Sequence, residues 1–385
     1  MRPDIQDANS SRPTVLVLGG RASSLVNFRA PLIEELCARR YRVVAAAGED
    51  EAAVGDELRA RGIEYAPVGL NRTGTNPFSE VAMVLELNAL MRRVRPAIFI
   101  GYTIKSVIYG LIAARLAGVP RRFAMITGLG YAFTEGNEIK RRLLRRISGS
   151  LYRTALKFAD RVLFQNPDDR DYFVGKGFVM AEKTALVNGS GVDLARFVPA
   201  PLPPTPLTFL LIARLLRDKG IREYCEAARI VKNAHPEVHF LLAGPFDSNP
   251  AGIAQDELDG WTNSATIEYL GSLNDVRPAL AASHVYVLPS YREGTPRTVL
   301  EAMATGRAII TTNVPGCRET VQPGVNGYLV PAKDPKALAQ AMLNFLATPT
   351  LAKQMGQTSL EMVSERFESR AVAQQTADML GLYVI

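Results

Sequence analysis

Short runs of apolar residues alternate along the chain with longer segments whose apolar residues recur at helical spacing. A helical pattern near 27–40 follows the first apolar run. In the first half the apolar runs are TVLVLGG (14–20), YRVVAAAG (41–48), AIFIGY (97–102), RRFAMITGLG (121–130) and RVLFQN (161–166). Strands that alternate with helices usually pair in parallel with helices on both faces, so the pattern predicts a doubly wound α/β sheet.

A proline-rich segment, FVPAPLPPTPLT (197–208), is typical of an interdomain linker because proline cannot donate to a sheet ladder. The alternation starts again after it, which predicts a second Rossmann-like sheet. We therefore expect an N-terminal domain over 1–198 and a C-terminal domain over 207–364, with a helix over about 365–385 that packs back on the first. Ligands of such sheets bind beyond the carboxyl ends of the strands, so two facing domains predict an active site in the cleft between them.

Composition fits this organisation. The 385 residues exceed what one hydrophobic core usually serves, and 47% hydrophobic with 22% charged residues is typical of a soluble globular protein. Three scattered cysteines fit neither a disulfide framework nor a zinc cluster. The polar N-terminus predicts no signal peptide, and no apolar run reaches the length of a membrane span. These features together predict a cytoplasmic protein.

The stretch YREGTPRTVLEAMATGRAIITT (291–312) places two glutamates around the start of a helix. HVYVLPS (284–290) reads as the preceding strand, Thr295 with Pro296 as the N-cap and first turn, and Gly306 as the C-terminal cap. The N–H groups of Arg297 and Thr298 would then form an anion site. Gly294, which has no side chain, would let the backbone approach a ligand closely at this site.

In this arrangement Glu293 lies in the turn beside the anion site, and Glu301 reaches a vicinal diol such as that of ribose. Taken singly, each glutamate is more often a solvated or salt-bridged surface residue. The glycine, the helix start and the preceding strand together favour the ligand interpretation.

Two cations follow the first strand of the second domain, in IARLLRDKG (212–220). Arg214 and Lys219 could neutralise a diphosphate or form a surface pair at a helix start, and their spacing does not decide between the two. Gly19 and Gly20 end the first strand of the chain without forming the GxGxxG of a dinucleotide enzyme.

The stretch EGTPRTVLEAMATGRAIITTNVPGCRETV (293–321) resembles the signature of the family-4 retaining glycosyltransferases of the GT-B fold. The resemblance covers nearly the whole chain and is strongest over 205–335. It implies a nucleotide-diphosphate sugar, expected here to be a UDP-sugar, bound mainly by the C-terminal domain. Catalytic roles fall on Glu293, Arg214 and Lys219, and no metal is required. The donor residues that the resemblance implies are Gly19, Gly20, Arg214, Lys219, Leu273, Glu293, Gly294, Thr295, Arg297, Thr298 and Glu301.

The N-terminal domain is expected to bind the acceptor. GYTIKSVIYG (101–110) follows a strand and opens a helix, so Tyr102, Thr103 and Lys105 are expected to face the cleft, with Thr127 from MITGLGYAF (125–133). Lys105 is a phosphate contact or a surface lysine. Many family members place a histidine near here, whereas all three histidines of this chain lie in the second domain.

The phrases YTIKSVIYG and MITGLGYAF resemble the bacterial subgroup that adds N-acetylhexosamine or a related sugar to undecaprenyl-diphosphate-linked sugars in glycan, O-antigen or capsule assembly. This likeness implies a lipid-linked acceptor and peripheral association with the inner face of the plasma membrane.

The net charge of +7 suggests an anionic partner or a solvated arginine-rich surface. The basic segment 138–161 has Ile139, Leu143, Ile147 and Leu151 on one predicted side and arginines opposite. It suits an anionic membrane surface or, as the alternative, a docked helix with a solvated basic face. Gly149 is a candidate break in that helix.

Asp169-Arg170-Asp171 is literally a DxD, the metal-diphosphate motif of another transferase fold. Asn166-Pro167 precedes it, so we interpret it as helix-start chemistry.

Other functions compete with sugar transfer. A nucleotide-sugar hydrolase, epimerase or phosphorylase has the same fold, and a sugar-binding protein without turnover shares the motifs. A basic nucleic-acid-binding protein is disfavoured because the chain lacks aromatic-basic interleaving and a recognised binding module. The sequence does not specify the sugar, the base, the linkage or the oligomeric state.

Overall fold

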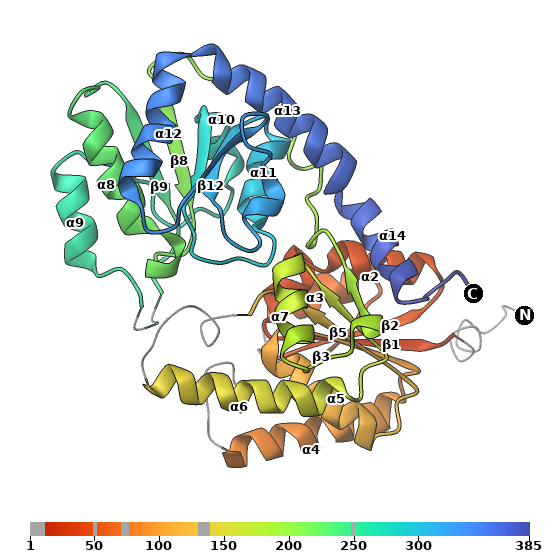
Figure 1. Cartoon of the computed structure of the whole chain (residues 1–385). Coiled ribbons are helices and arrows are strands. Elements are labelled where there is room, and N and C mark those ends of the chain that lie inside the picture. The colour runs from red at the N-terminus through yellow and green to blue at the C-terminus, as the bar shows by residue number, and fades with distance from the viewer. Residues whose placement is uncertain (1–11, 49–51, 71–76, 130–138, 248, 250) are drawn as a thin grey trace, which may run out of the picture. The chain divides into compact units, whose positions relative to one another are not determined.

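The computed structural model describes residues 12–48, 52–70, 77–129, 139–247, 249 and 251–385, without the side chains of residues 77 and 139–144. The chain divides into two compact units: unit 1 (Met1–Ser190 and Arg370–Ile385) and unit 2 (Gly191–Ser369). Each unit contains one parallel sheet with helices packed against it (Figure 1). The predicted fold class, two doubly wound α/β sheets, is confirmed.

Unit 1 is built on a seven-stranded sheet in the order β3-β2-β1-β4-β5-β6-β7. Its neighbouring strands all pair in parallel. The order reverses between β1 and β4, which makes the carboxyl ends of these two strands the switch point of the sheet. The strands are β1 (Thr14–Gly19), β2 (Arg42–Ala47), β3 (Glu64–Pro67), β4 (Ile98–Tyr102), β5 (Arg121–Ile126), β6 (Arg161–Phe164) and β7 (Thr184–Leu186).

Two helical layers cover this sheet because its strands are apolar on both faces. In β1, Leu16 and Leu18 enter one core cluster while Val15 and Val17 enter the other. The first cluster is covered by α4 (Pro77–Val94), α5 (Ile104–Leu116), α6 (Ile139–Leu156) and α7 (Pro167–Gly175). The second is covered by α1 (Ala22–Asn27), α2 (Ala30–Ala38), α3 (Ala52–Ala60) and α14 (Ser369–Met379).

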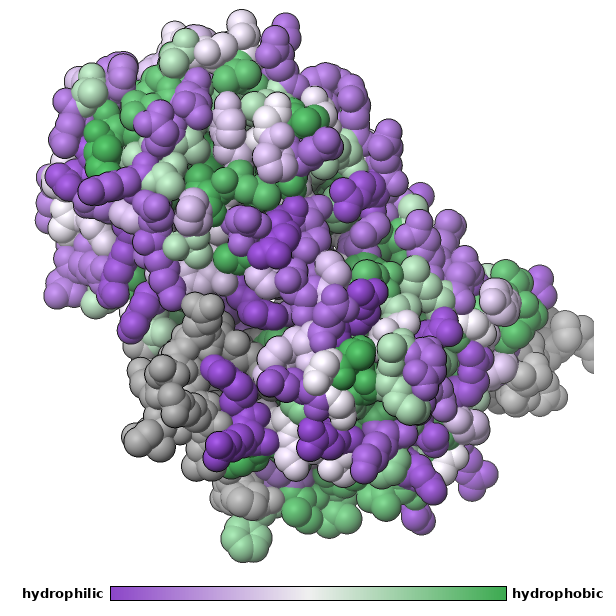
Figure 2. All heavy atoms as spheres, viewed as in Figure 1, coloured by the Kyte–Doolittle hydropathy of each residue, from purple (hydrophilic) through white to green (hydrophobic). Residues whose placement is uncertain are grey.

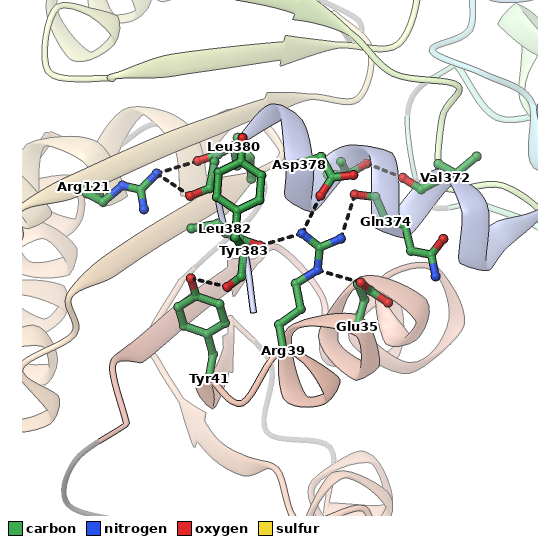
Figure 3. Close-up of polar contacts among 12 residues, drawn as sticks. Glu35, Arg39, Tyr41, Arg121, Val372, Gln374, Asp378, Leu380, Leu382 and Tyr383 are labelled. Atoms are coloured by element: carbon green, nitrogen blue, oxygen red, sulfur yellow. Dashed lines mark hydrogen bonds and ion pairs between the residues drawn. The ribbon is translucent and has the colours of Figure 1, made fainter. Parts of the chain in front are cut away.

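Three arginines fix the C-terminal segment to the rest of unit 1, and Figure 3 shows two of them, Arg39 and Arg121. The Arg39 guanidinium donates to the Asp378 carboxylate and to the Leu382 carbonyl, both at 2.6 Å. Arg121 donates to the Leu380 carbonyl at 2.6 Å, and Arg161 donates to the Met379 carbonyl at 2.7 Å. Since Leu380 and Leu382 are also buried, polar and apolar contacts hold the segment together.

Unit 2 repeats the plan with six parallel strands in the order β10-β9-β8-β11-β12-β13. Its switch point lies between β8 and β11. The strands are β8 (Thr208–Ile212), β9 (His239–Ala243), β10 (Glu268–Tyr269), β11 (Val285–Leu288), β12 (Ala308–Thr312) and β13 (Gly327–Val330). The helices are α8 (Ile221–Lys232), α9 (Gln255–Asn263), α10 (Arg277–Ala281), α11 (Arg297–Ala304), α12 (Pro335–Ala347) and α13 (Thr350–Arg366).

The proline-rich segment 197–208 belongs to unit 2, since the boundary between the units falls at Ser190 and Gly191. The fully buried Arg307 donates to the carbonyls of Ala200 and Pro201, both at 3.1 Å. Burial lowers the pKa of Arg307 to about 10, and these carbonyls supply part of the polar environment that its charge needs.

The basic helix α6 runs unbroken through Gly149, so the expected break is wrong. Gly149 is buried, and a Cβ there would lie 2.7 Å from the ring of Phe178, so the glycine permits close packing. Tyr152 is buried and Leu151 packs against the core, whereas Ile147 is half exposed. The predicted side-chain arrangement over 139–144 lies outside the described residues. Among the helices that the structure describes, none is long and apolar enough to span a bilayer.

Candidate active site

The carboxyl ends of β8 and β11 bring together three polar side chains of unit 2. Lys219 ends the 3₁₀ turn that follows β8, while Ser290 and Glu293 follow β11. Lys219 Nζ lies 2.5 Å from Glu293 Oε1, and Ser290 Oγ donates to the same oxygen at 2.8 Å. The switch point of unit 2 therefore carries a cation and a carboxylate in direct contact.

This ion pair is largely withdrawn from water, with the Lys219 and Glu293 side chains 18% and 16% exposed. Burial by itself lowers the pKa of Lys219. The charge and hydrogen bond of Glu293, helped by the neighbouring Asp218, outweigh burial, and the pKa of Lys219 is raised. Lys219 is consequently held as a cation at neutral pH, as binding of a phosphate requires.

A glycine from the next loop holds the backbone of Glu293 in place. The Glu293 N–H donates to the Pro315 carbonyl at 3.0 Å. Gly316 has φ +84°, and a Cβ at this position would lie 2.3 Å from the Glu293 carbonyl oxygen. Only glycine combines this backbone conformation with so close an approach. The segment NVPGCRE after β12 thus positions the first glutamate of the motif.

The second glutamate lies on α11 and is paired within its own helix. Glu301 is 9% exposed, and Arg297 Nε donates to Glu301 Oε1 at 3.0 Å. Burial raises the pKa of Glu301, and the charge of Arg297 offsets only part of that rise. Glu301 therefore has the salt-bridge partner that the alternative interpretation expected, but it is a shielded carboxylate and not a residue of the helix surface.

The predicted helix start is wrong by one residue. α11 begins at Arg297 with Pro296 as its N-cap, and no side chain caps it. Pro296 itself has extended backbone angles, with φ −73° and ψ 107°, so it occupies the N-cap position and Thr295 lies one residue outside the helix. Gly306, with φ +82°, follows the C-cap Thr305 as predicted for a helix end.

Arg214 lies in the same region but has a different partner. Its Nη1 is 2.7 Å from Asp247 Oδ2, and its side chain is 47% exposed. The charge of Arg214 opposes the rise in the pKa of Lys219, which shows that the two cations are close enough to repel each other. The two cations predicted to share a diphosphate therefore meet at one site, each held by its own carboxylate.

Four other predicted donor residues also belong to unit 2. Gly294 is buried, Thr295 is half-buried, and Thr298 shares a hydrogen bond with the buried Tyr286. Leu273 is half-buried and packs against the apolar cluster that includes Leu300 of α11. The Leu273 side chain thus packs on the core of unit 2, and a place for this residue in the donor site stays a prediction.

The switch point of unit 1 gathers the predicted residues of β1 and β4. A Cβ at Gly19 would lie 2.1 Å from Tyr102 Oη, and one at Gly20 would lie 3.0 Å from Thr103 Oγ1. Tyr102 is only 2% exposed, and its hydroxyl is 2.8 Å from Ser24 Oγ. Burial raises the pKa of Tyr102 to about 12. The expectation that Tyr102 faces a ligand is corrected, because Gly19 covers its ring.

Thr103 has the most unusual backbone of this region, with φ +73° at the N-cap of α5. A β-branched residue in this conformation is strained, and such strain is concentrated at functional sites. Lys105, two residues on, is neither a free cation nor a surface lysine: Nζ lies 2.5 Å from Glu80 Oε1, and the side chain is 18% exposed. Thr127 is half-buried just beyond β5. Residues 130–133 of the MITGLGYAF phrase lie outside the described residues.

Sequence reasoning missed Ser290, Asp247 and Gly316. Ser290 and Asp247 are polar residues just beyond strand ends, a position that could have marked them. Gly316 was part of the quoted motif, but its close approach to Glu293 is visible only in three dimensions.

The stretch Asp169-Arg170-Asp171 lies in the N-terminal half of α7, and its interpretation as helix-start chemistry is confirmed. Asn166 caps α7 and accepts from the Asp169 N–H at 2.8 Å, and Asn166 Nδ2 donates to Asp169 Oδ2 at 3.2 Å. Within the described residues no group of three or more His, Cys, Asp or Glu side chains could hold a metal ion.

Two doubly wound parallel sheets in one chain define the GT-B class of fold. Sucrose-phosphate synthase from Thermosynechococcus elongatus has a TM-score of 0.79 at 20% identity, covering 96% of this chain and 98% of that one. HepE from Anabaena in complex with UDP has a TM-score of 0.73 at 18% identity, covering 96% and 99%. These likenesses establish the fold.

Two family profiles then give the family. The one described as "Glycosyl transferase 4-like domain" matches residues 27–189, and the one described as "Glycosyl transferases group 1" matches residues 206–348. The chain belongs to this family of glycosyltransferases and is a sugar-transferring enzyme, which confirms the resemblance seen in the sequence.

Curated relatives agree with this assignment. The N,N'-diacetylbacillosaminyl-diphospho-undecaprenol alpha-1,3-N-acetylgalactosaminyltransferase of Campylobacter jejuni is 29% identical over 89% of this chain and 93% of its own length. The UDP-Gal:alpha-D-GlcNAc-diphosphoundecaprenol alpha-1,3-galactosyltransferase of Escherichia coli is 26% identical over 69% and 70%.

Proposed function

We propose that the enzyme transfers a hexose or N-acetylhexosamine from a UDP-sugar to a sugar carried on polyprenyl diphosphate, with retention of the anomeric configuration. The names of the two curated relatives support the acceptor, since both act on sugars linked to undecaprenyl diphosphate. The E. coli relative uses UDP-galactose, and the Anabaena structure contains UDP, which supports the donor. The product would serve glycan, O-antigen or capsule assembly.

The observation that carries this proposal is the Lys219–Glu293 pair at the switch point of unit 2. A lysine that stays charged there can bind the donor diphosphate, while Glu293 can accept from sugar hydroxyls. Arg214 and the N-terminus of α11 add positive charge beside it. As the bond to the sugar breaks, these groups stabilise the negative charge that develops on the departing UDP.

The remaining predicted residues fall into two groups. In unit 2, Glu301 would accept from the ribose hydroxyls, and Gly294 with Thr298 would line the diphosphate position. In unit 1, Gly19 and Gly20 would contribute backbone to the donor site. Unit 1 would also bind the acceptor, through Thr103, Lys105 and Thr127 and with Tyr102 supporting the loop from beneath. Retention would follow from a reaction on one face of the sugar, in which the leaving phosphate assists the acceptor hydroxyl.

An acceptor carried by a polyprenyl chain lies in a membrane. We therefore propose that the enzyme acts at the cytoplasmic face of the plasma membrane, with the basic segment 138–161 near anionic lipid. The exposed Arg146, Arg153 and Lys157 of this segment support the charge side of that proposal.

A thermal-shift screen of UDP-, GDP- and ADP-sugars tests the donor site. We expect a UDP-sugar to raise the melting temperature of the wild type and Glu301→Ala to lose most of that gain. Glu257→Ala serves as a matched control, because Glu257 pairs with Arg222 on the outside of unit 2 and should leave the gain unchanged. If no nucleotide sugar shifts the wild-type melting temperature, the donor assignment fails.

Turnover separates transfer from hydrolysis or epimerisation of the donor. We expect slow release of UDP from the donor alone and rapid release after addition of a polyprenyl-diphosphate-linked sugar. Equal rates with and without the acceptor would instead support a nucleotide-sugar hydrolase, and conversion of the donor to another UDP-sugar without release of UDP would support an epimerase.

A further inference from the structure

Helix α4 exposes a row of large apolar side chains on one of its sides. Phe78 is 85% exposed, Val81 61% and Leu85 63%. Residues three and four positions apart lie next to one another on a helix surface, so the three form one stripe, which the exposed Ala82 and Ala89 continue. We call Phe78, Val81 and Leu85 the α4 stripe.

The stripe lies away from the side of α4 that packs into the core of unit 1. The opposite side of α4 supplies Met83, Leu87, Leu90 and Met91 to the core, and all four are buried. Across the described part of the chain, no other helix carries three large apolar residues this exposed. A contiguous apolar surface of this kind on a folded protein marks a binding surface.

Cationic residues lie beside the stripe. Arg92 and Arg93 are exposed in the last turn of α4. α4 and α6 both pack against α5, so they belong to the same outer layer, and α6 contains arginines and a lysine but no acid. Figure 2 shows hydrophobic surface along the edge where Figure 1 draws α4, below hydrophilic surface over α6.

The acidic residues of α4 do not cancel this charge. Glu80 pairs with Lys105 through Oε1 at 2.5 Å, and Glu86 Oε1 accepts from the Gly69 N–H at 2.9 Å. Lys105 neutralises Glu80, whereas the exposed Glu86 keeps its negative charge, and the two exposed arginines Arg92 and Arg93 outnumber it.

We propose that α4 inserts Phe78, Val81 and Leu85 into the headgroup boundary of an anionic bilayer, while the arginines of α4 and α6 lie against lipid phosphates. An apolar stripe flanked by cations is the chemistry of a helix that lies in a membrane interface. The inference rests on the proposed function for its biological meaning, because a polyprenyl-linked acceptor requires the enzyme at a membrane. It assigns insertion to α4, since Leu151 and Tyr152 of α6 pack against the core.

Charge decides between a bilayer and a second copy of the chain. Two copies that met through this surface would bring Arg92, Arg93 and the α6 cations of one copy towards those of the other. Like charges in an interface disfavour association, whereas the same charges favour an anionic lipid surface.

Vesicle flotation tests the proposal without donor or acceptor, so it can fail independently of the proposed function. The wild type should float with vesicles of phosphatidylcholine and phosphatidylglycerol. A triple variant, Phe78→Gln, Val81→Gln and Leu85→Gln, should bind about 100-fold more weakly, because three apolar side chains no longer leave water. Glutamine is a good helix former, so α4 should persist, as circular dichroism and an unchanged melting temperature would verify.

A control variant replaces three exposed apolar residues elsewhere. Met180→Gln, Val198→Gln and Val325→Gln change residues that are 56%, 57% and 39% exposed, and this protein should float like the wild type. The UDP-sugar melting shift should be the same in all three proteins. Equal flotation of the stripe variant and the wild type, or no flotation of the wild type, would overturn the proposal.

Insertion is distinguished from electrostatic adsorption by a tryptophan placed in the stripe. Leu85→Trp should be quenched by brominated lipid, while the native Trp261 in unit 2 gives the same background in wild type and variant. Arg146→Gln should weaken flotation most at low salt. An unquenched Leu85→Trp, or a light-scattering mass that falls from dimer to monomer in the triple variant, would contradict membrane insertion.

Discussion

The two units place different chemistry at the same position of the same fold. In unit 2 the loops after β8 and β11 carry the Lys219–Glu293 ion pair, with Arg214 close by. In unit 1 the loops after β1 and β4 carry glycines packed against Tyr102, whose ring is almost completely buried. Both positions are switch points, where a doubly wound sheet opens its strand ends to a ligand.

The difference shows that the sheet topology determines where a ligand can bind, whereas the side chains at that position determine which ligand it suits. Unit 2 keeps charges shielded and paired, which suits a ligand that brings phosphates and hydroxyls. Unit 1 has a strained backbone, with Thr103 at φ +73°, beside the buried ring of Tyr102, over which the Arg29 guanidinium lies 4.8 Å from the ring centroid. This contrast leads to four expected effects, which decrease from the first to the last.

Gly316→Ala tests how far the charged site depends on one close backbone approach. The new Cβ would lie 2.3 Å from the Glu293 carbonyl oxygen at a φ of +84°, so we expect a loss of about 3 kcal/mol in the free energy of unfolding and loss of UDP binding. Gly324→Ala is the matched control, because its φ is +77° with nothing within 4 Å. Urea denaturation and calorimetric titration measure both. Similar losses in the two variants would show that φ alone accounts for the effect.

Lys219→Ala tests the cation itself. It removes a charged contact to the diphosphate and leaves Glu293 shielded without its lysine, so UDP should bind about 30- to 100-fold more weakly. Arg222→Ala removes an exposed cation three residues away, paired with Glu257, and should change the Kd less than threefold. Isothermal titration gives both values, and equal Kd values would remove Lys219 from the donor site.

Gly19→Ala tests the close packing of Gly19 against Tyr102 in unit 1. The added methyl group would lie 2.1 Å from Tyr102 Oη, and the buried ring has little room to move, so we expect a cost of about 1–3 kcal/mol. Gly175→Ala, at the end of α7 with nothing within 4 Å, should change the free energy of unfolding by less than about 0.5 kcal/mol. A cost as small for Gly19→Ala would show that Tyr102 is free to rearrange.

Glu301→Gln is expected to have the smallest effect, a change in the dependence of stability on pH. Burial raises the folded-state pKa of Glu301 above its unfolded value, so the folded state holds this proton more tightly. The resulting stabilisation is present below the unfolded pKa and is lost as pH rises from there through the folded pKa. The variant should therefore lose less stability than the wild type between pH 4 and 7. The free energy of unfolding is measured by urea denaturation at several pH values. The same dependence on pH in the variant and the wild type would contradict a raised pKa of Glu301.

Most of the fold could be predicted, because the buried parallel strands are continuous apolar runs. TVLVLG, TFLLI and AIITT are strands as expected. The short strands β3 and β7 were missed, since EYAP and TAL have too few apolar residues to stand out. The start of α11 was misplaced by one residue, since the pattern Thr-Pro favours proline in the first turn whereas the extended backbone of Pro296 makes it the N-cap.

The candidate site was predicted in composition but not in pairing. The sequence indicated Lys219, Glu293, Arg214 and Glu301 as the charged set. It could not show that Lys219 contacts Glu293, 74 residues away, while Arg214 contacts Asp247. Such partners depend on which loops follow neighbouring strands. The interpretation of Lys105 changed for the same reason, because Glu80 reaches it from another helix.

The sequence by itself determined that this chain forms two doubly wound sheets and belongs to the glycosyltransferases, because apolar periodicity and the spacing of Glu293 and Glu301 are local properties. Only the tertiary structure decided which side chains meet, which are shielded and which stay exposed. It buried Tyr102 under Gly19, paired Lys219 with Glu293 and left the α4 stripe in water. The physical reason is that burial and electrostatic pairing arise between segments that are far apart in the chain. The number of residues between two such segments does not determine how close they lie in the folded protein.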